Sequence, residues 1–161
     1  MKVFISHKSD DMKIAEKHAD DLRSLGFEIY FDKYDPNIAS SKDKAKYIQD
    51  KILESTDLLV IITENTQDSW WVPFEIGIST VFDVRIASIV YDNSPPLPSF
   101  IKKWPIIDTQ EKYKLYLNEL KISNRVLSKC FSAEHGPLRE DYSVRVSDAF
   151  HEKLLRSFST M

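Results

Sequence analysis

Residues 52–77, ILESTDLLVIITENTQDSWWVPFEIG, predict the centre of the fold. They join a nearly continuous Leu/Val/Ile run at 57–63 to a second apolar segment at 69–82. A run without polar alternation is typical of a parallel strand that is buried on both faces. The second segment is long enough for a helix and tolerates Pro73 near its first turn. A buried strand followed by an apolar helix is the repeating unit of α/β proteins.

The same kind of unit recurs on both sides of this stretch. Apolar runs and helical spacing predict strands at 2–6, 27–31, 85–91 and 104–107, and helices at 9–26, 42–56 and 108–121. This order implies a parallel sheet with helices on both faces. Sites in such sheets lie outside the carboxyl ends of the strands. We therefore expect residues 6–9, 32–42 and 64–75 to meet at one edge.

The C-terminal part of the chain shows no second core. Residues 134–141 favour a turn, and 142–158 favour a helix with Phe150 and Leu154 on its apolar face. We expect one domain at 1–121 and a C-terminal helical extension at 122–161 that packs on the same domain.

Composition excludes several classes of protein. The 161 residues are 42% hydrophobic and 29% charged, with a formal net charge of −3. No basic run indicates a nucleic-acid partner, and no apolar run reaches the roughly 18 to 20 residues that span a membrane. Cys130 is the only cysteine, so the chain forms no internal disulfide, and no Cys/His cluster predicts a metal. These features, with no signal peptide at the N-terminus, indicate a cytoplasmic protein.

Trp71 and Glu75 are the first candidate pair. Residues four apart on a helix share a face, with their Cβ atoms about 5 to 6 Å apart. An indole beside a carboxylate can form a pocket for a flat ring. The spacing alone favours an ordinary alternative, with Trp71 packed in the core and Glu75 a first-turn carboxylate favoured by the helix dipole.

Ser6, His7 and Lys8 form a second candidate group. They leave a strand and enter a helix N-terminus, where backbone N–H groups and a lysine suit a phosphate. An ordinary turn with helix capping explains the same residues. No glycine-rich nucleotide loop and no nucleophile elbow is present.

Three segments together resemble the bacterial branch of the Toll/interleukin-1 receptor (TIR) domain family. They are VFISHKSDD at 3–11, GFEIYFD at 26–32, and residues 52–77, where Ser55, Ser69 and Glu75 follow the family order. The resemblance covers about 1–121. It implies a flavodoxin-like TIR fold, a five-stranded, mainly parallel sheet with helices on both faces, here with a C-terminal helical appendage. The loop after the second strand departs from many relatives because it contains Pro36 but no glycine.

The resemblance also implies an activity. Many bacterial and plant TIR domains cleave NAD between nicotinamide and ribose and release ADP-ribose or a cyclic isomer. Glu75 matches the catalytic glutamate of the family, and Trp71 matches the tryptophan four residues before it. Nicotinamide leaves as a neutral molecule, so one carboxylate suffices, whereas ordinary glycosides need a second carboxyl group. NAD is then the substrate, and no cofactor is needed.

The expected site contains more than this pair. Glu75 is the expected catalytic residue, Trp71 a stacking wall, and the further substrate-binding residues are Ser6, His7, Lys8, Phe31, Asp32 and Tyr34. Relatives often work only as assemblies, so self-association through TIR–TIR contacts is expected. Because the chain has no room for a sensor domain, we expect a separate effector that senses the nucleotide product, as in anti-phage systems such as Thoeris.

Two other functions remain open at this point. TIR domains in animal signalling act mostly as non-enzymatic adaptors, in which Glu75 is a surface or structural residue. Nucleoside deoxyribosyltransferase-like enzymes share a related layout and a catalytic glutamate, although the order of motifs fits them less well.

Overall fold

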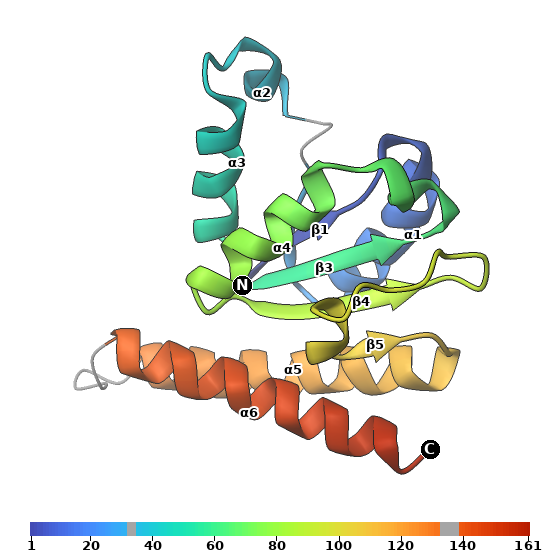
Figure 1. The fold of residues 1–161 in the computed structure, drawn as a ribbon. Helices are drawn as coiled ribbons and strands as arrows, with labels where there is room; N and C mark the ends of the chain where they lie inside the picture. The colour runs from blue at the N-terminus through green and yellow to red at the C-terminus, as the bar shows by residue number, and fades with distance from the viewer. Residues whose placement is uncertain (32–34, 133–138) are drawn as a thin grey trace.

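A computed structural model describes residues 1–31, 35–132 and 139–161 of the chain (Figure 1). Its centre is a five-stranded sheet in the order β2-β1-β3-β4-β5, and every pairing is parallel. The strands are β1 (Lys2–Ser6), β2 (Glu28–Tyr30), β3 (Asp57–Ile62), β4 (Arg85–Val90) and β5 (Ile106–Ile107). The predicted flavodoxin-like fold is confirmed.

Strand β3 lies at the middle of the sheet, and all six of its residues are buried. Its Val60 pairs with Ser6 of β1 on one side and with Ser88 of β4 on the other. The unbroken apolar run therefore forms a strand that is covered on both faces, as predicted.

The helices divide between the two faces of the sheet. Helices α3 (Lys44–Leu53) and α4 (Trp71–Val81) cover the face that carries Phe4 and Val60, whereas α1 (Met12–Ser24) covers the face that carries Ile5. Successive strand residues point to opposite faces, which explains this alternation. Short 3₁₀ segments lie at Ser9–Asp11 (η1), Glu64–Asp68 (η3) and Ile101–Lys103 (η4).

The segment expected to be a polar loop at 32–42 contains a short helix, α2 (Pro36–Ser40). Proline favours the first helical position because its fixed φ suits a helix and its missing N–H is not needed there. The Asp35 carboxylate accepts a hydrogen bond from the Asn37 backbone N–H at 2.9 Å. It also accepts the hydroxyls of Tyr30 at 3.2 Å and Tyr47 at 2.6 Å, which anchors the start of α2.

Two long helices form the C-terminal part. Helices α5 (Gln110–Ser132) and α6 (Arg139–Ser159) lie side by side below the sheet in Figure 1. Phe150 and Leu154 of α6 enter the core that α1 covers. The backbone N–H of Ile86 donates to His151 Nε2 at 2.8 Å, which fastens α6 to β4. The expected boundary at 121/122 falls within continuous α5, and that division stays a prediction.

No helix in the described ranges combines the length and the apolar character that crossing a membrane requires.

Candidate functional site

Helix α4 begins at the carboxyl edge of the sheet and carries Glu75 on its inner face. The Val72 backbone N–H donates to Ser69 Oγ at 3.3 Å at the start of the helix. The buried residues of α4 are Val72, Glu75, Ile76 and Ser79. Only 2% of Glu75 is exposed. Glu75 is therefore held inside the protein rather than in water.

Trp71 lies one turn before Glu75 and is 42% exposed. Its ring meets Phe74 edge to face, with 5.6 Å between the ring centroids. The alternative role for this pair, in which Trp71 packs in the core and Glu75 is a carboxylate of the first helical turn, is wrong for both residues. Trp70, at 91% exposure, is more open still. A half-exposed indole one turn from a buried acid leaves an aromatic surface open to a partner or a ligand.

Ser6, His7 and Lys8, at the end of β1 and just after it, lie in different environments. Ser6 is 1% exposed and lies on the face that α4 covers, since it shares the parity of Phe4. The His7 ring nitrogen Nδ1 lies 3.2 Å from the Ile5 carbonyl oxygen, and an N–H there donates to it. Lys8 is partly exposed and precedes η1.

His7 meets Phe31 edge to face at 5.5 Å. Phe31 belongs to the core on the α1 face and is 5% exposed. The structure thus brings His7 and Phe31 together and leaves Ser6 and Glu75 on the α4 face. The predicted residues Asp32 and Tyr34 lie outside the described residues.

Asp11 is a residue of this edge that the sequence did not single out. It is 2% exposed. Its two carboxylate oxygens accept the Thr63 hydroxyl at 2.7 Å and the Asn65 amide at 2.8 Å. Asp11 therefore ties the turn after β1 to the turn after β3. It also places a carboxylate at the start of α1, where a phosphate would otherwise be favoured.

A polar hollow of about 300 Å³ opens beside Asp11 at the carboxyl edge. It is lined by Asp11, Ile14, Thr63, Glu64, Asn65, Tyr91, Asp92 and Asn93. Tyr91 connects it to His18, whose Nε2 lies 3.1 Å from the tyrosine hydroxyl. Burial lowers the pKa of His18 to about 4, so this core histidine is neutral near pH 7.

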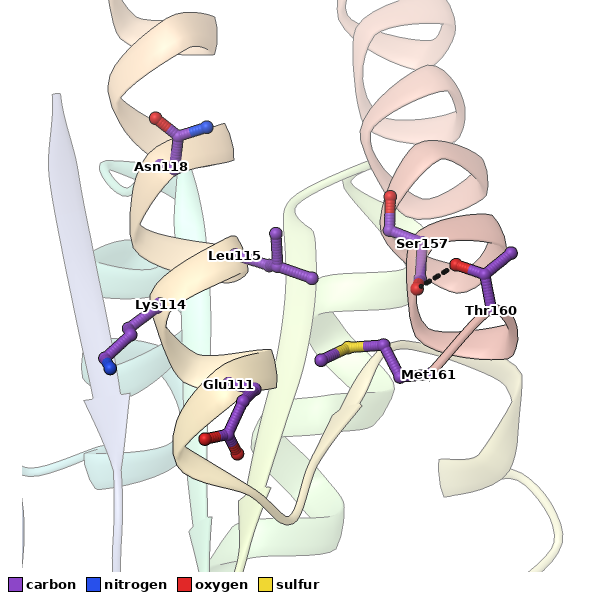
Figure 2. Close-up of a pocket in the computed structure, with 7 residues that line it drawn as sticks. All are labelled: Glu111, Lys114, Leu115, Asn118, Ser157, Thr160 and Met161. Atoms are coloured by element: carbon purple, nitrogen blue, oxygen red, sulfur yellow. Dashed lines mark hydrogen bonds between the residues drawn. The ribbon is translucent and has the colours of Figure 1, made fainter.

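A second hollow, of about 610 Å³, lies between α5 and α6 (Figure 2). Leu115 and Met161 point toward each other across it, and Glu111, Lys114, Asn118, Ser157 and Thr160 also line it. It belongs to the C-terminal helices and includes none of the residues predicted for the site. Among the residues that the structure describes, no group of three or more His, Cys, Asp or Glu could hold a metal ion.

A family model described as TIR domain matches residues 3–120. The chain belongs to the TIR domain family. The match covers the sheet and ends within α5, close to the limit of the resemblance seen in the sequence. A comparison with functionally curated proteins gives no match. Because TIR domains include both NAD-cleaving enzymes and interaction modules, membership alone leaves these two functions open.

Proposed function

We propose that this TIR domain cleaves NAD at the bond between nicotinamide and ribose. The observation that carries the proposal is the burial of Glu75, at 2% exposure, one turn from the half-exposed Trp71. A carboxylate on an apolar helix is seldom buried without a role, because burial penalises the charged form. The position at the carboxyl edge of a parallel sheet is where ligands bind in this class of fold.

The chemistry needs one negative group beside the ribose. The glycosidic C–N bond breaks, its electron pair neutralises the pyridinium nitrogen, and nicotinamide leaves without being protonated. Positive charge then develops on the ribose. The Glu75 carboxylate stabilises that charge more strongly in a dry site than in water. Attack by water and loss of one proton gives ADP-ribose, whereas attack by a nitrogen of the adenine ring gives a cyclic isomer.

The remaining residues take supporting roles in the proposal. Trp71 offers a stacking surface for the nicotinamide. Ser6 lies on the same face as Glu75, and Lys8, partly exposed just before η1, offers a cation to a phosphate. Self-association, a cytoplasmic location and a separate effector that reads an anti-phage nucleotide signal remain parts of this proposal.

The direct test is to incubate the purified protein with NAD at high protein concentration and to measure free nicotinamide by chromatography. We expect Glu75→Gln to lower the rate of release by about a hundredfold or more, since it removes a charge that acts in the transition state. Glu64→Gln is the matched control, because Glu64 is an exposed glutamate of the same edge. Equal rates in the wild type and Glu75→Gln would contradict the assignment.

A second candidate is a non-enzymatic interaction module. It is favoured by apolar residues on the outer surface of α4 and beside it, where Trp70 is 91% and Val81 71% exposed. Exposed apolar residues that gather on one surface often mark a contact with another protein. Concentration-dependent self-association without release of nicotinamide would support this function over the enzyme.

A further inference from the structure

Asp11 is a buried carboxylate that joins two turns of the chain. It is 2% exposed and lies in η1, within the turn after β1. Its Oδ2 atom accepts the Thr63 hydroxyl at 2.7 Å, and its Oδ1 atom accepts the Asn65 side-chain amide at 2.8 Å. Hydrogen bonds to a carboxylate are roughly twice as strong as those between neutral groups. The turn after β1 is therefore firmly tied to the turn after β3.

Thr63 connects this anchor to the start of α4. Its hydroxyl accepts the Asn65 backbone N–H at 3.0 Å, and its backbone N–H donates to the Thr66 hydroxyl at 3.0 Å, as part of the capping box of η3. The Ser69 backbone N–H donates to the Thr66 carbonyl oxygen at 3.0 Å. The Val72 backbone N–H donates in turn to Ser69 Oγ at 3.3 Å. A series of hydrogen bonds thus leads from the buried carboxylate to the first turn of α4.

The two segments that this series joins carry the residues of the proposed site. Trp71 begins α4, and Glu75 follows one turn later on the inner face of the helix. His7 and Lys8 belong to the turn after β1. The first backbone N–H groups of a helix have no partner within the helix, so the place where a helix begins depends on the groups that cap it. The bonds of Asp11 therefore act on the spacing between the two segments.

We infer that Asp11 is a positioning residue, which sets where α4 begins and therefore how Trp71 is presented at the carboxyl edge of the sheet. The inference builds on the proposed function, because it assigns a positioning residue to the site that we propose acts on NAD. Asp11 acts through Thr63 and Asn65, which occupy its two carboxylate oxygens, and needs no contact with the substrate.

A purely stabilising role for Asp11 would give a different result. If its hydrogen bonds only stabilised the fold, their removal would raise the unfolded fraction and leave the folded molecules unchanged. If they position α4, the folded molecules themselves change at the first turn of the helix. The test therefore compares folded protein with folded protein, through a signal that comes from Trp71.

NMR of the indole N–H groups supplies that signal and needs no substrate. The protein is labelled with ¹⁵N, and the Trp71 signal is assigned as the one absent from Trp71→Phe. We expect this signal to move by more than its line width in Asp11→Ala and in Thr63→Val, whereas the signal of Trp104, which lies in the core, stays in place. Thr63→Val keeps the carboxylate and removes one of its donors, so the test does not depend on whether Asp11→Ala folds. Thr63→Ser retains the hydroxyl and should bring the signal back toward its wild-type position.

Asp10→Ala is the matched control, because Asp10 is the neighbouring carboxylate of η1 and is exposed. The Trp71 signal of this variant should coincide with that of the wild type. A Trp71 signal that stays in place in Thr63→Val and in folded Asp11→Ala, or that moves as far in Asp10→Ala, overturns the inference.

The outcome is separable from the proposed function. Absence of nicotinamide release from the wild type would reject the enzyme and leave the NMR result standing. In an enzyme that does release nicotinamide, Asp11→Ala and Thr63→Val should raise KM for NAD by up to about tenfold, the effect expected when a ring no longer stacks well on Trp71. An unchanged KM in both variants would also overturn the inference, while the activity itself would stand.

Discussion

At the scale of the residue, the proposed function depends on Glu75 and Trp71. Burial of a carboxylate penalises its charged form. A buried Glu75 is therefore compatible with folding only where neighbouring groups stabilise its charge or where its carboxyl group remains protonated. A half-exposed indole one turn away can cover a flat ring and exclude water from the same place. Neither residue alone provides both effects.

Replacing Trp71 tests whether its indole covers a flat ring of the substrate. We expect Trp71→Ala to raise KM for NAD about tenfold, because stacking on an aromatic side chain contributes about 1 to 3 kcal/mol. The fold should survive, since the side chain is 42% exposed. Steady-state kinetics against NAD measure the change, and circular dichroism checks the fold.

Trp70→Ala is the control for this variant, because Trp70 is the neighbouring indole and is 91% exposed. The KM of Trp70→Ala for NAD should stay within twofold of the wild-type value. A larger effect at Trp70 than at Trp71 would mean that the outer surface of α4, rather than its Glu75 side, meets the substrate or an activating neighbour.

At the scale of the element, α2 depends on one carboxylate. Asp35 caps the helix and accepts hydrogen bonds from two tyrosines, and the Tyr47 hydrogen bond is the main cause that lowers the pKa of Asp35. These bonds join β2, α2 and α3 at this edge of the sheet.

Asp35→Ala should lower the free energy of unfolding by about 2 kcal/mol, through the lost cap and the two tyrosine hydroxyls left without this partner. Urea denaturation followed by circular dichroism measures it. Asp43→Ala is the matched control, since the Asp43 carboxylate caps α3 through the Lys46 backbone N–H at 2.9 Å. The Tyr47 backbone N–H donates to the Asp43 carbonyl oxygen at 3.1 Å, a bond that alanine keeps. Equal losses in both variants would show that the tyrosines do not anchor α2.

At the scale of the whole molecule, the buried His18 and the partly buried His151 link folding to pH. Burial lowers the pKa of His18 and of His151 to about 4, from an ordinary value of 6.5. Between these values the unfolded chain binds protons that the folded chain does not. Stability is therefore complete above about pH 6.5 and falls as the pH drops toward 4, by up to about 1.4 kcal/mol per unit for each histidine.

His151→Gln should reduce this dependence by about half, because glutamine does not titrate but still offers an oxygen to the Ile86 N–H. Urea unfolding between pH 5 and pH 7 measures the slope, above the range in which carboxylates such as Asp35 gain protons. An unchanged slope in His151→Gln would mean that His151 is not protonated on unfolding in this range.

The pattern of apolar residues along the sequence was sufficient to predict most of the fold. The apolar run at 57–63 marks the central strand, and the spacing within 9–26 and 108–121 marks two helices. These signals lie within a few residues of one another, so they can be recognised without the tertiary structure. The family match at 3–120 agrees with the range that the motifs indicated.

The site could be predicted only in part, because its arrangement depends on contacts between distant segments. Asp11 meets Thr63 and Asn65, more than fifty residues away in the chain. Spacing could place Trp71 and Glu75 near each other but could not indicate which one faces the core. The separation of His7 and Ser6 onto two faces follows from strand parity, a signal that the sequence did contain.

The three tryptophans of the chain lie in three different environments. Trp104 is 8% exposed in the core, Trp71 is 42% exposed beside Glu75, and Trp70 is 91% exposed. Indole fluorescence shifts to longer wavelength as the ring meets water. Replacing Trp70 by phenylalanine would leave one emitter at the site and one in the core, so that unlabelled protein would report the arrival of a ligand and the loss of the fold as two separate optical signals.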